Sequence, residues 1–294
     1  MDGFGLAPLD GGFSGETFLA EAAGERSVVR VYADRGARRG PAAVEVDAAV
    51  LRLVRGLLPV PEVLEVRRAD DAAGTPALLV TSFLPGDRLD LVLPRATADQ
   101  RVRLGRSVGR VLSRLAQMPM LRAGMFLDGD LRTGPLPAED LVDWVRSHRA
   151  GTALERWPAA SYDGLLAVAD RAQGLLDGVD RVCLVHSDFN PKNLLVDPAT
   201  GEVTGVLDWE FAHAGSPYTD LGNLLRFERD EALTAAVLEI WTCAVGGTPE
   251  ETLALARAAD LWALVDLAAR RGANPVTDRA HDLLLAIAEA GPGE

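Results

Sequence analysis

The sequence predicts an α+β protein with two lobes, a small antiparallel β-sheet carrying one helix and a larger, mainly helical lobe. Short apolar runs separated by turn residues fill the first 83 positions, a pattern typical of strands. Beyond residue 97, apolar residues recur at helical spacing. At 294 residues the chain is also long for one hydrophobic core. Because Pro85 and Gly86 break the last strand-like run, we expect lobes at residues 1–85 and 86–294 with a cleft between them.

The first strands surround a glycine-rich turn. Residues 4–32 predict a strand, a glycine loop and two further strands. In the loop, Gly12, Ser14 and Gly15 would let backbone amides close over phosphates without obstruction by side chains. A simple hairpin turn is the alternative, because the full Gly-x-Gly-x-x-Gly pattern is absent.

One helix and two more strands complete the small lobe. Residues 42–57 carry a stripe of apolar side chains at helical spacing, with Gly56 near the end. Two prolines follow and stop the helix. Residues 63–66 and 77–83 have the composition of the last two strands of the small sheet.

The large lobe is expected to be helical at both ends. Its first helix follows a capping box from Thr97 to Gln100 and carries apolar residues on one face. Residues 119–136 predict an irregular connection rich in Gly, Leu and Asp. Further helices are expected at residues 137–149, 161–177, 230–245, 249–271 and 277–290.

Three apolar runs interrupt this helical pattern and predict buried strands, at residues 182–185, 194–196 and 203–207. Turn residues at 197–201 join the last two runs into a hairpin. Each run has polar residues at its end, where a chain leaving the core can present them to a cleft. We therefore expect a rigid frame that holds one amide and two carboxylates.

The polar residues of this frame, Asp188, Asn193 and Asp208, are the groups that phosphoryl transfer needs. Its transition state is stabilised mostly by positioning and by metal ions. Asp188 would accept the proton of the acceptor hydroxyl, and Asn193 would turn its amide oxygen to Mg²⁺. Asp208 would hold the Mg²⁺ that bridges the nucleotide phosphates. A lone loop aspartate is usually a solvated turn residue, but this combination at this spacing favours a catalytic role.

The segments His186-x-Asp188-x-x-x-x-Asn193, Asp208-Trp-Glu and Asp220-Leu-Gly-Asn resemble the motifs of the aminoglycoside phosphotransferase family, antibiotic kinases of the protein-kinase-like fold. The resemblance implies that ATP or GTP, together with Mg²⁺, supplies a phosphate that is moved to a hydroxyl group. It also implies that His186 is a buried organiser of the catalytic loop, and that Asp220 hydrogen-bonds to the backbone of that loop.

The same resemblance implies nucleotide-binding residues in the small lobe. Arg30, on the third strand, stands where protein kinases have a lysine, and Glu45 on the helix would hold it over the cleft. Solvent-facing side chains are the alternative for both residues. An extended backbone at Ser82, Phe83 and Leu84 would hydrogen-bond to the adenine edge and act as the hinge.

The formal charge of −13 argues against nucleic acid and anionic membranes as partners, because both need a basic surface. It fits a cationic acceptor. In the resembling family, acidic residues of the large lobe bind polycationic antibiotics, so we expect an aminoglycoside or a basic cyclic peptide of the viomycin and capreomycin type, with resistance as the result. The candidate acceptor-binding carboxylates are Glu210, Asp230, Glu231, Asp260 and Asp266. A neutral macrolide would instead need an apolar groove, to which Trp241 and Trp262 would contribute.

The short distance between Asp208 and Asp220 bears on the class of acceptor. Twelve residues leave no room for a long activation segment, so a small molecule is favoured over a protein. A metabolic kinase of the choline, homoserine or fructosamine type is one alternative, and a nucleotide-binding pseudokinase is another. The presence of all three frame residues argues against the pseudokinase.

The remaining features concern the cellular compartment. Cys183 and Cys243 lie in apolar surroundings and predict buried thiols rather than a disulfide or a metal site. Neither a signal peptide nor an apolar run long enough to cross a bilayer is evident. We therefore expect a cytoplasmic protein that is a monomer or a homodimer.

Overall fold

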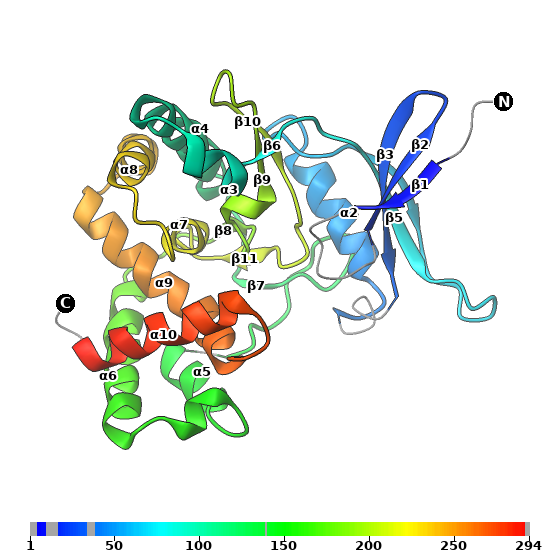
Figure 1. Cartoon of the computed structure of the whole chain (residues 1–294). Coiled ribbons are helices and arrows are strands. Elements are labelled where there is room, and N and C mark those ends of the chain that lie inside the picture. The colour runs from blue at the N-terminus through cyan, green and yellow to red at the C-terminus, as the bar shows by residue number, and fades with distance from the viewer. Residues whose placement is uncertain (1–4, 10–16, 34–38, 139, 292–294) are drawn as a thin grey trace.

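A computed structural model describes residues 5–9, 17–33, 39–138 and 140–291. The β-sheet of the small lobe lies at one side of the molecule and the helices of the large lobe lie at the other (Figure 1). This arrangement confirms the predicted fold class. None of the helices in the described ranges is both long and apolar enough to cross a membrane.

The small lobe is built on a five-stranded sheet in which all neighbouring strands are antiparallel. In spatial order the strands are β1 (Gly5–Pro8), β2 (Thr17–Ala22), β3 (Glu25–Tyr32), β5 (Ala77–Ser82) and β4 (Val63–Arg67). Alternate side chains of β5 are buried, which gives the sheet one apolar face. The register places Arg30 of β3 opposite Leu79 of β5, near the middle of the sheet.

Helix α2 (Ala43–Val54) covers this face and packs against β4 and β5. Its buried side chains include Val50 and Val54, both fully shielded from solvent. The helix ends earlier than the expected residue 57, because Arg55 is extended and Gly56 takes a left-handed conformation with φ 81°.

The large lobe contains seven helices of seven or more residues in its described part. They are α4 (Ala98–Ala116), α5 (Leu141–Ser147), α6 (Ala159–Leu176), α7 (Thr219–Leu225), α8 (Glu231–Val245), α9 (Pro249–Ala269) and α10 (Pro275–Ala290). The predicted capping box opens α4, where the Gln100 amide donates to Thr97 Oγ1 and the Thr97 amide to Gln100 Oε1. Helix α7 was not expected, because its seven residues are too few to display a helical period.

The three predicted strands of the frame are present as β8 (Cys183–Val185), β9 (Leu194–Val196) and β10 (Val203–Val206). Strands β9 and β10 form the expected antiparallel hairpin. Three very short strands extend the frame: β6 (Asp87–Arg88) pairs with β9, while β7 (Gly124–Met125) and β8 pair with β11 (His213–Gly215). Strands of two or three residues are too short for the alternation that would reveal them in the sequence.

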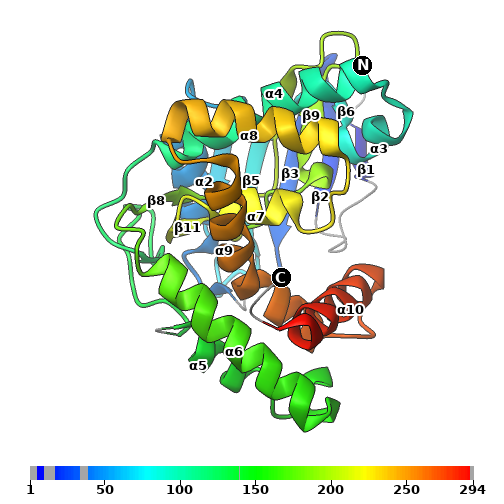
Figure 2. The same ribbon diagram turned by 90° about the vertical axis from the view of Figure 1, so that its left-hand side faces the viewer.

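Two apolar cores stabilise the molecule. The first is continuous from α2 and the sheet through α4, the frame, α7 and α8. The second joins α5, α6, α9 and α10. Figure 2 shows the same division, with α4 and α8 at one end of the lobe, α5, α6 and α10 at the other, and α9 between them.

The two cysteines differ in their environment. Cys183 is buried in β8, as expected, whereas Cys243 is exposed, which contradicts the prediction of a buried thiol. Trp241 on the same helix is fully buried. Two residues correspond to about 200° around an α-helix, so Cys243 lies on the face opposite to Trp241.

The close contact between α4 and α8 depends on glycine. A Cβ atom at Gly105 would lie 2.7 Å from the carbonyl oxygen of Leu233 and 2.8 Å from Cβ of Ala236. Such distances force the helices apart. Gly174 on α6 has no heavy atom within 4 Å of an added Cβ and provides a matched control.

We predict that Gly105→Ala lowers the melting temperature and Gly174→Ala does not. Overpacking costs about 1–3 kcal/mol, and the better helix propensity of alanine returns only about 1 kcal/mol. In Gly174→Ala only the favourable term remains. Thermal unfolding followed by circular dichroism measures both variants, and equal melting temperatures for the two would contradict the prediction.

Candidate active site

The predicted catalytic loop leaves β8 through a tight turn that Asp220 fixes. Asp220, on α7, is buried, and its two carboxylate oxygens accept the backbone amides of His186 at 2.8 Å and Ser187 at 2.7 Å. Ser187 takes a left-handed conformation with φ 65°. Burial raises the pKa of Asp220 to about 7, and the two amides act in the opposite direction. The expected hydrogen bonding of Asp220 to the loop backbone is therefore present.

His186 is completely buried beneath this loop. Its Nε2 lies 2.7 Å from the carbonyl oxygen of Leu207, and its Nδ1 accepts the backbone amide of Asp188 at 3.2 Å. Its ring packs against Trp209, with centroids 4.7 Å apart. Burial lowers the pKa of His186 to about 4, so the ring is neutral at physiological pH. Both ring nitrogens are used inside the protein, as expected for an organiser of the loop.

Asp188 follows directly and points its carboxylate to two amide groups. Asn190 Nδ2 donates to Oδ1 at 2.9 Å, and Asn193 Nδ2 donates to Oδ2 at 2.8 Å. Burial raises the pKa of Asp188 to about 6, with a further increase from Asp208 and a partial reduction by the two amides. A carboxylate with this pKa is ionised at pH 7 and remains basic enough to accept a proton.

The hairpin brings Asn193 and Asp208 together. The Leu207 amide donates to the carbonyl oxygen of Asn193 at 2.8 Å. This hydrogen bond lies at the open end of the hairpin, just before β9 begins and just after β10 ends. Since Nδ2 of Asn193 is used by Asp188, its Oδ1 is the atom left for a ligand. Asp208 has φ 62°, a left-handed conformation that turns its side chain away from the hairpin and toward the small lobe.

Arg30 of β3 meets Asp208 from the small lobe. Arg30 Nη1 lies 2.9 Å from Asp208 Oδ1, and Nη2 lies 2.5 Å from Glu210 Oε2. Burial alone lowers the pKa of the guanidinium, but Asp208, Tyr32 and Glu210 reverse this, and the pKa lies above its ordinary value. Glu45, which was expected from the sequence to hold Arg30, is therefore not its partner.

The predicted pair of Arg30 and Glu45 is wrong. Glu45 forms an ion pair with Arg68 instead. The carboxylate of α2 that faces inward is Asp47, which is 3% exposed and accepts hydrogen bonds from Tyr32 and Arg39. A signal for Asp47 existed in the sequence, because it lies beside Val46 and Val50 on the apolar stripe of the helix, where an acid needs a buried partner.

Asn193 and Asp208 suit Mg²⁺ by their chemistry. Magnesium prefers oxygen ligands and is commonly held by one or two protein side chains together with phosphate oxygens and water. The described part of the chain contains no group of three or more His, Cys, Asp or Glu side chains arranged to hold a metal. The two oxygen donors therefore fit a metal that arrives with a nucleotide better than a metal held by protein alone.

Comparison with known proteins agrees with this geometry. The sequence model of the Phosphotransferase enzyme family (APH) matches residues 5–255, most of the chain. The chain belongs to this family. The match includes both the small lobe and the whole frame from β8 to α7.

Curated relatives of this phosphotransferase-family chain carry two kinds of name. An aminoglycoside 3'-phosphotransferase of Streptomyces fradiae is 33% identical over 156 residues, which cover 51% of this chain and 52% of that protein. The mouse protein named acyl-CoA dehydrogenase family member 10 is 27% identical over 221 residues, or 74% of this chain. The chain spans only 20% of the length of that mouse protein and 11% of mouse family member 11.

Solved structures show the same fold. The aminoglycoside phosphotransferase APH(4)-Ia, in a ternary complex with ADP and hygromycin B, superposes with a TM-score of 0.67 over 99% of this chain and 95% of that one, at 19% identity. The GDP complex of an aminoglycoside 2'-phosphotransferase gives a TM-score of 0.69, covering 98% and 93% of the two chains at 15% identity. At these identities the likeness concerns the fold alone.

In this protein, most of the carboxylates that were expected to bind the acceptor already pair with other side chains. Asp260 is 5% exposed and accepts three hydrogen bonds from Arg226 and one from Asn223. It therefore holds α9 against α7, and its assignment to the acceptor is corrected. Glu210 pairs with Arg30, as described above.

The other three acids lie at helix surfaces. Asp230 caps α8 by accepting the Leu233 amide and pairs with Arg101 at 2.5 Å. Asp266 pairs with Arg270 one turn further along α9. Glu231 is exposed in the first turn of α8. The sequence did not reveal these pairings, because only the fold places each acid beside its arginine.

Of the two tryptophans expected to line an apolar groove for a neutral macrolide, one cannot do so. Trp241 is fully buried between α4 and α8 and cannot line a groove, while Trp262 is partly buried and packs against Trp144 with ring centroids 5.4 Å apart.

In the predicted hinge, the Ser82 amide donates to the carbonyl oxygen of Glu62 at 2.8 Å, so this amide is already paired within the small lobe. Phe83 and Leu84 stay as predicted hinge contacts, whereas Gly12, Ser14 and Gly15 lie outside the described residues.

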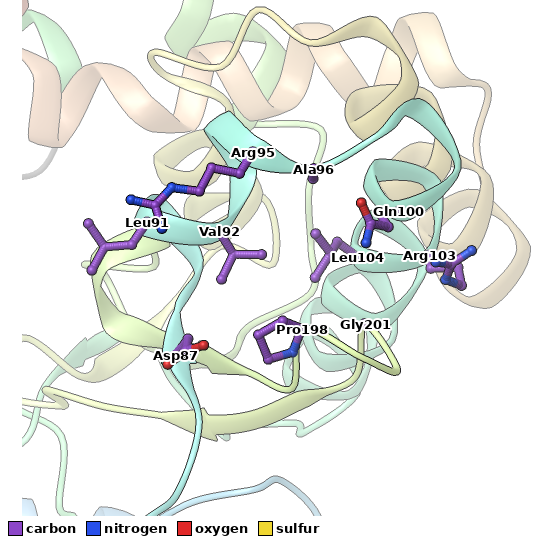
Figure 3. Close-up of a pocket in the computed structure, with 10 residues that line it drawn as sticks. All are labelled: Asp87, Leu91, Val92, Arg95, Ala96, Gln100, Arg103, Leu104, Pro198 and Gly201. Atoms are coloured by element: carbon purple, nitrogen blue, oxygen red, sulfur yellow. The ribbon is translucent and has the colours of Figure 1, made fainter.

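A separate hollow of about 320 Å³ lies behind the hairpin, between the start of α4, the short helix α3 (Leu89–Val92) and the turn at Gly201. Figure 3 shows Val92, Leu104 and Pro198 around its apolar floor. None of the predicted catalytic, nucleotide-binding or metal-binding residues lines this hollow. It is therefore distinct from the candidate active site.

We predict that kcat/KM for phosphoryl transfer falls as the pH drops below about 6. Asp188 must be ionised to accept a proton, and its pKa of about 6 sets this limb of the profile. Asn190→Ala removes a donor that stabilises the ionised form, so its limb should move to higher pH. A profile in which Asn190→Ala and the parent coincide would contradict the assignment of the limb to Asp188.

Proposed function

We propose that this protein transfers the γ-phosphate of ATP or GTP to a hydroxyl group of a small molecule. The observation that carries the proposal is the convergence of Asp188, Asn193 and Asp208 at one end of the β9–β10 hairpin, facing Arg30 of the small lobe. Membership of the phosphotransferase family and nucleotide complexes of structural neighbours support it. The cytoplasm, which supplies both nucleotides, is the proposed location.

The proposal gives each of these residues a defined task, and Asn193 has two. Asn190 and Asn193 orient the carboxylate of Asp188, which accepts the proton of the acceptor hydroxyl. The new oxygen–phosphorus bond forms as the bond between the γ-phosphorus and the bridging oxygen breaks, and ADP or GDP leaves. Arg30 binds nucleotide phosphate oxygens with its guanidinium. Asn193 and Asp208 would hold Mg²⁺, which when bound neutralises charge on the phosphates. His186 and Asp220 keep the loop in position.

We predict that Asp188→Asn reduces turnover by about 10²–10⁴-fold, the usual contribution of positioned proton transfer. Nucleotide affinity should change little, because the side chain contacts the acceptor and not the phosphates. Asp163→Asn on the exposed face of α6 is the matched control and should keep the turnover of the parent. If Asp188→Asn turns over as fast as the control, Asp188 is not the base.

The acceptor that we propose is a cationic antibiotic, an aminoglycoside or a basic cyclic peptide. The charge of −13 supports it through attraction of a polycation, and one structural neighbour contains hygromycin B. A metabolic hydroxyl compound is the second candidate. It is favoured by the arginine partners of Asp230, Asp260 and Asp266, which leave these acids less able to bind ammonium groups.

An acceptor panel at several salt concentrations separates these candidates. We predict that kcat/KM is highest for an aminoglycoside or viomycin, higher than for choline, and falls as ionic strength rises, because salt screens the attraction to their several positive charges. The panel contains aminoglycosides, viomycin, a macrolide, choline, homoserine and a fructosamine. A best acceptor without net positive charge, with kcat/KM independent of salt, excludes the cationic antibiotic while leaving the kinase activity intact.

A further inference from the structure

The five-stranded sheet of the small lobe leaves β4 at one of its edges. Within the described residues β4 pairs only with β5, so the backbone groups along its other side have no strand beside them. The register with β5 is regular from Glu65 to Arg67, and the bridge between Asp70 and Thr75 continues it. At the opposite edge, β1 ends at Pro8, which has no N–H to donate. The edge of β4 is therefore the one better suited to accept a further strand.

The side chains of β4 alternate between the two faces of the sheet. Val66 lies opposite Leu79 of β5, on the face that α2 covers, and it packs against the first apolar core. Its neighbours Glu65 and Arg67 therefore point to the outer face. Their side chains are 50% and 60% exposed and form an ion pair at 2.7 Å. The outer face of this edge thus presents one acid and one base, two residues apart.

These two charges select one register for pairing with a second copy of the chain. A two-fold axis perpendicular to the sheet makes the two β4 strands antiparallel and keeps every residue on its own face. Near the middle of the strand, Glu65, Val66 or Arg67 can then lie opposite the same residue of the second copy. The first and third registers place like charges opposite each other, which is destabilising. The register centred on Val66 places Glu65 opposite Arg67 twice.

In this register the four charges alternate around a square, because each carboxylate has one arginine along its own strand and one across the interface. The two Val66 side chains meet on the inner face. The surrounding segment also suits two copies of an acidic protein. Residues 62–68 contain two glutamates and two arginines, whereas the whole chain carries −13. At physiological salt, repulsion between the more distant charges is screened beyond about 8 Å.

We propose that this protein forms a two-fold symmetric homodimer in which the β4 strands pair edge to edge, with the register set by Glu65 and Arg67. The two sheets then become one continuous sheet. Strand β5 separates β4 from β3, which carries Arg30, so the interface lies apart from the candidate active site and the inference does not rest on the proposed function. Because one short strand buries a small area, the dimer is a weak one.

Sedimentation equilibrium of the full chain at physiological salt, at concentrations up to about 500 µM, tests this interface. Glu65→Arg places an arginine opposite Arg67 of the second copy, and Arg67→Glu places a glutamate opposite Glu65. We expect each substitution to weaken the dimer about tenfold or more, because two attractive pairs become repulsive. The two substitutions change the net charge in opposite directions. A parent that stays monomeric, or affinities that shift in opposite directions, would overturn the proposal.

A mixture of these two single variants tests the pairing itself. In the mixed dimer, arginines at positions 65 and 67 of one copy lie opposite glutamates at both positions of the other. The mixture also carries the same total charge as two parent chains. We expect the mixture to dimerise about as tightly as the parent, although neither variant does so alone, which also shows that both variants fold. Failure of the mixture to form a dimer would rule out the β4 register.

The double variant Glu65→Arg with Arg67→Glu exchanges the two charges and restores opposite pairs across the interface, so its dimer affinity should lie within about threefold of the parent. The matched control is the exposed ion pair of Asp143 and Arg146 on α5, at 3.2 Å. Asp143→Arg and Arg146→Glu make the same charge reversals away from β4 and should leave dimer affinity unchanged. An equal loss of affinity in these controls would show that the dimer does not use the β4 edge.

Discussion

A buried carboxylate that accepts hydrogen bonds from two consecutive backbone amides determines where the predicted catalytic residues lie. Asp220 binds the amides of His186 and Ser187, and this holds the left-handed turn that directs Asp188 out of the core. Without this carboxylate, the buried amide of His186 and the partly buried amide of Ser187 would each lose a hydrogen bond, and the turn would be less stable. The neutral His186 ring then links the loop to the end of β10 through Leu207. The loop and the hairpin are thus one rigid body.

The sequence predicted the parts of the site whose chemistry lies close together along the chain. Asp188 and Asn193 are five residues apart, and a hairpin of known turn chemistry separates them from Asp208. Local pattern therefore sufficed to place these residues on one frame. The long helices were predictable for the same reason, since α4, α9 and α10 each begin at a capping residue, and α4 and α10 also display several turns of apolar periodicity.

What the sequence could not reveal are partners chosen by tertiary packing. Arg30 and Glu210 are 180 positions apart, and Asp260 and Arg226 are 34 apart. A permanently charged arginine takes whichever carboxylate the fold brings within reach. The rotation of α2 decided that Asp47, and not Glu45, is buried and accepts a hydrogen bond from Tyr32. Each position along a helix adds about 100° of rotation. Propensity and period do not fix such a rotation.

The two apolar cores meet along α9. Ala256 near its middle belongs to the core shared with the small lobe, whereas Leu261 and Val265 further along belong to the core of α5, α6 and α10. Asp260 lies between them and anchors the helix to α7. Substitutions within the second core therefore alter a group of helices that has its own packing and that α9 joins to the rest of the large lobe. A lineage built on this plan can remodel one end of the large lobe over evolutionary time and inherit the other end unchanged.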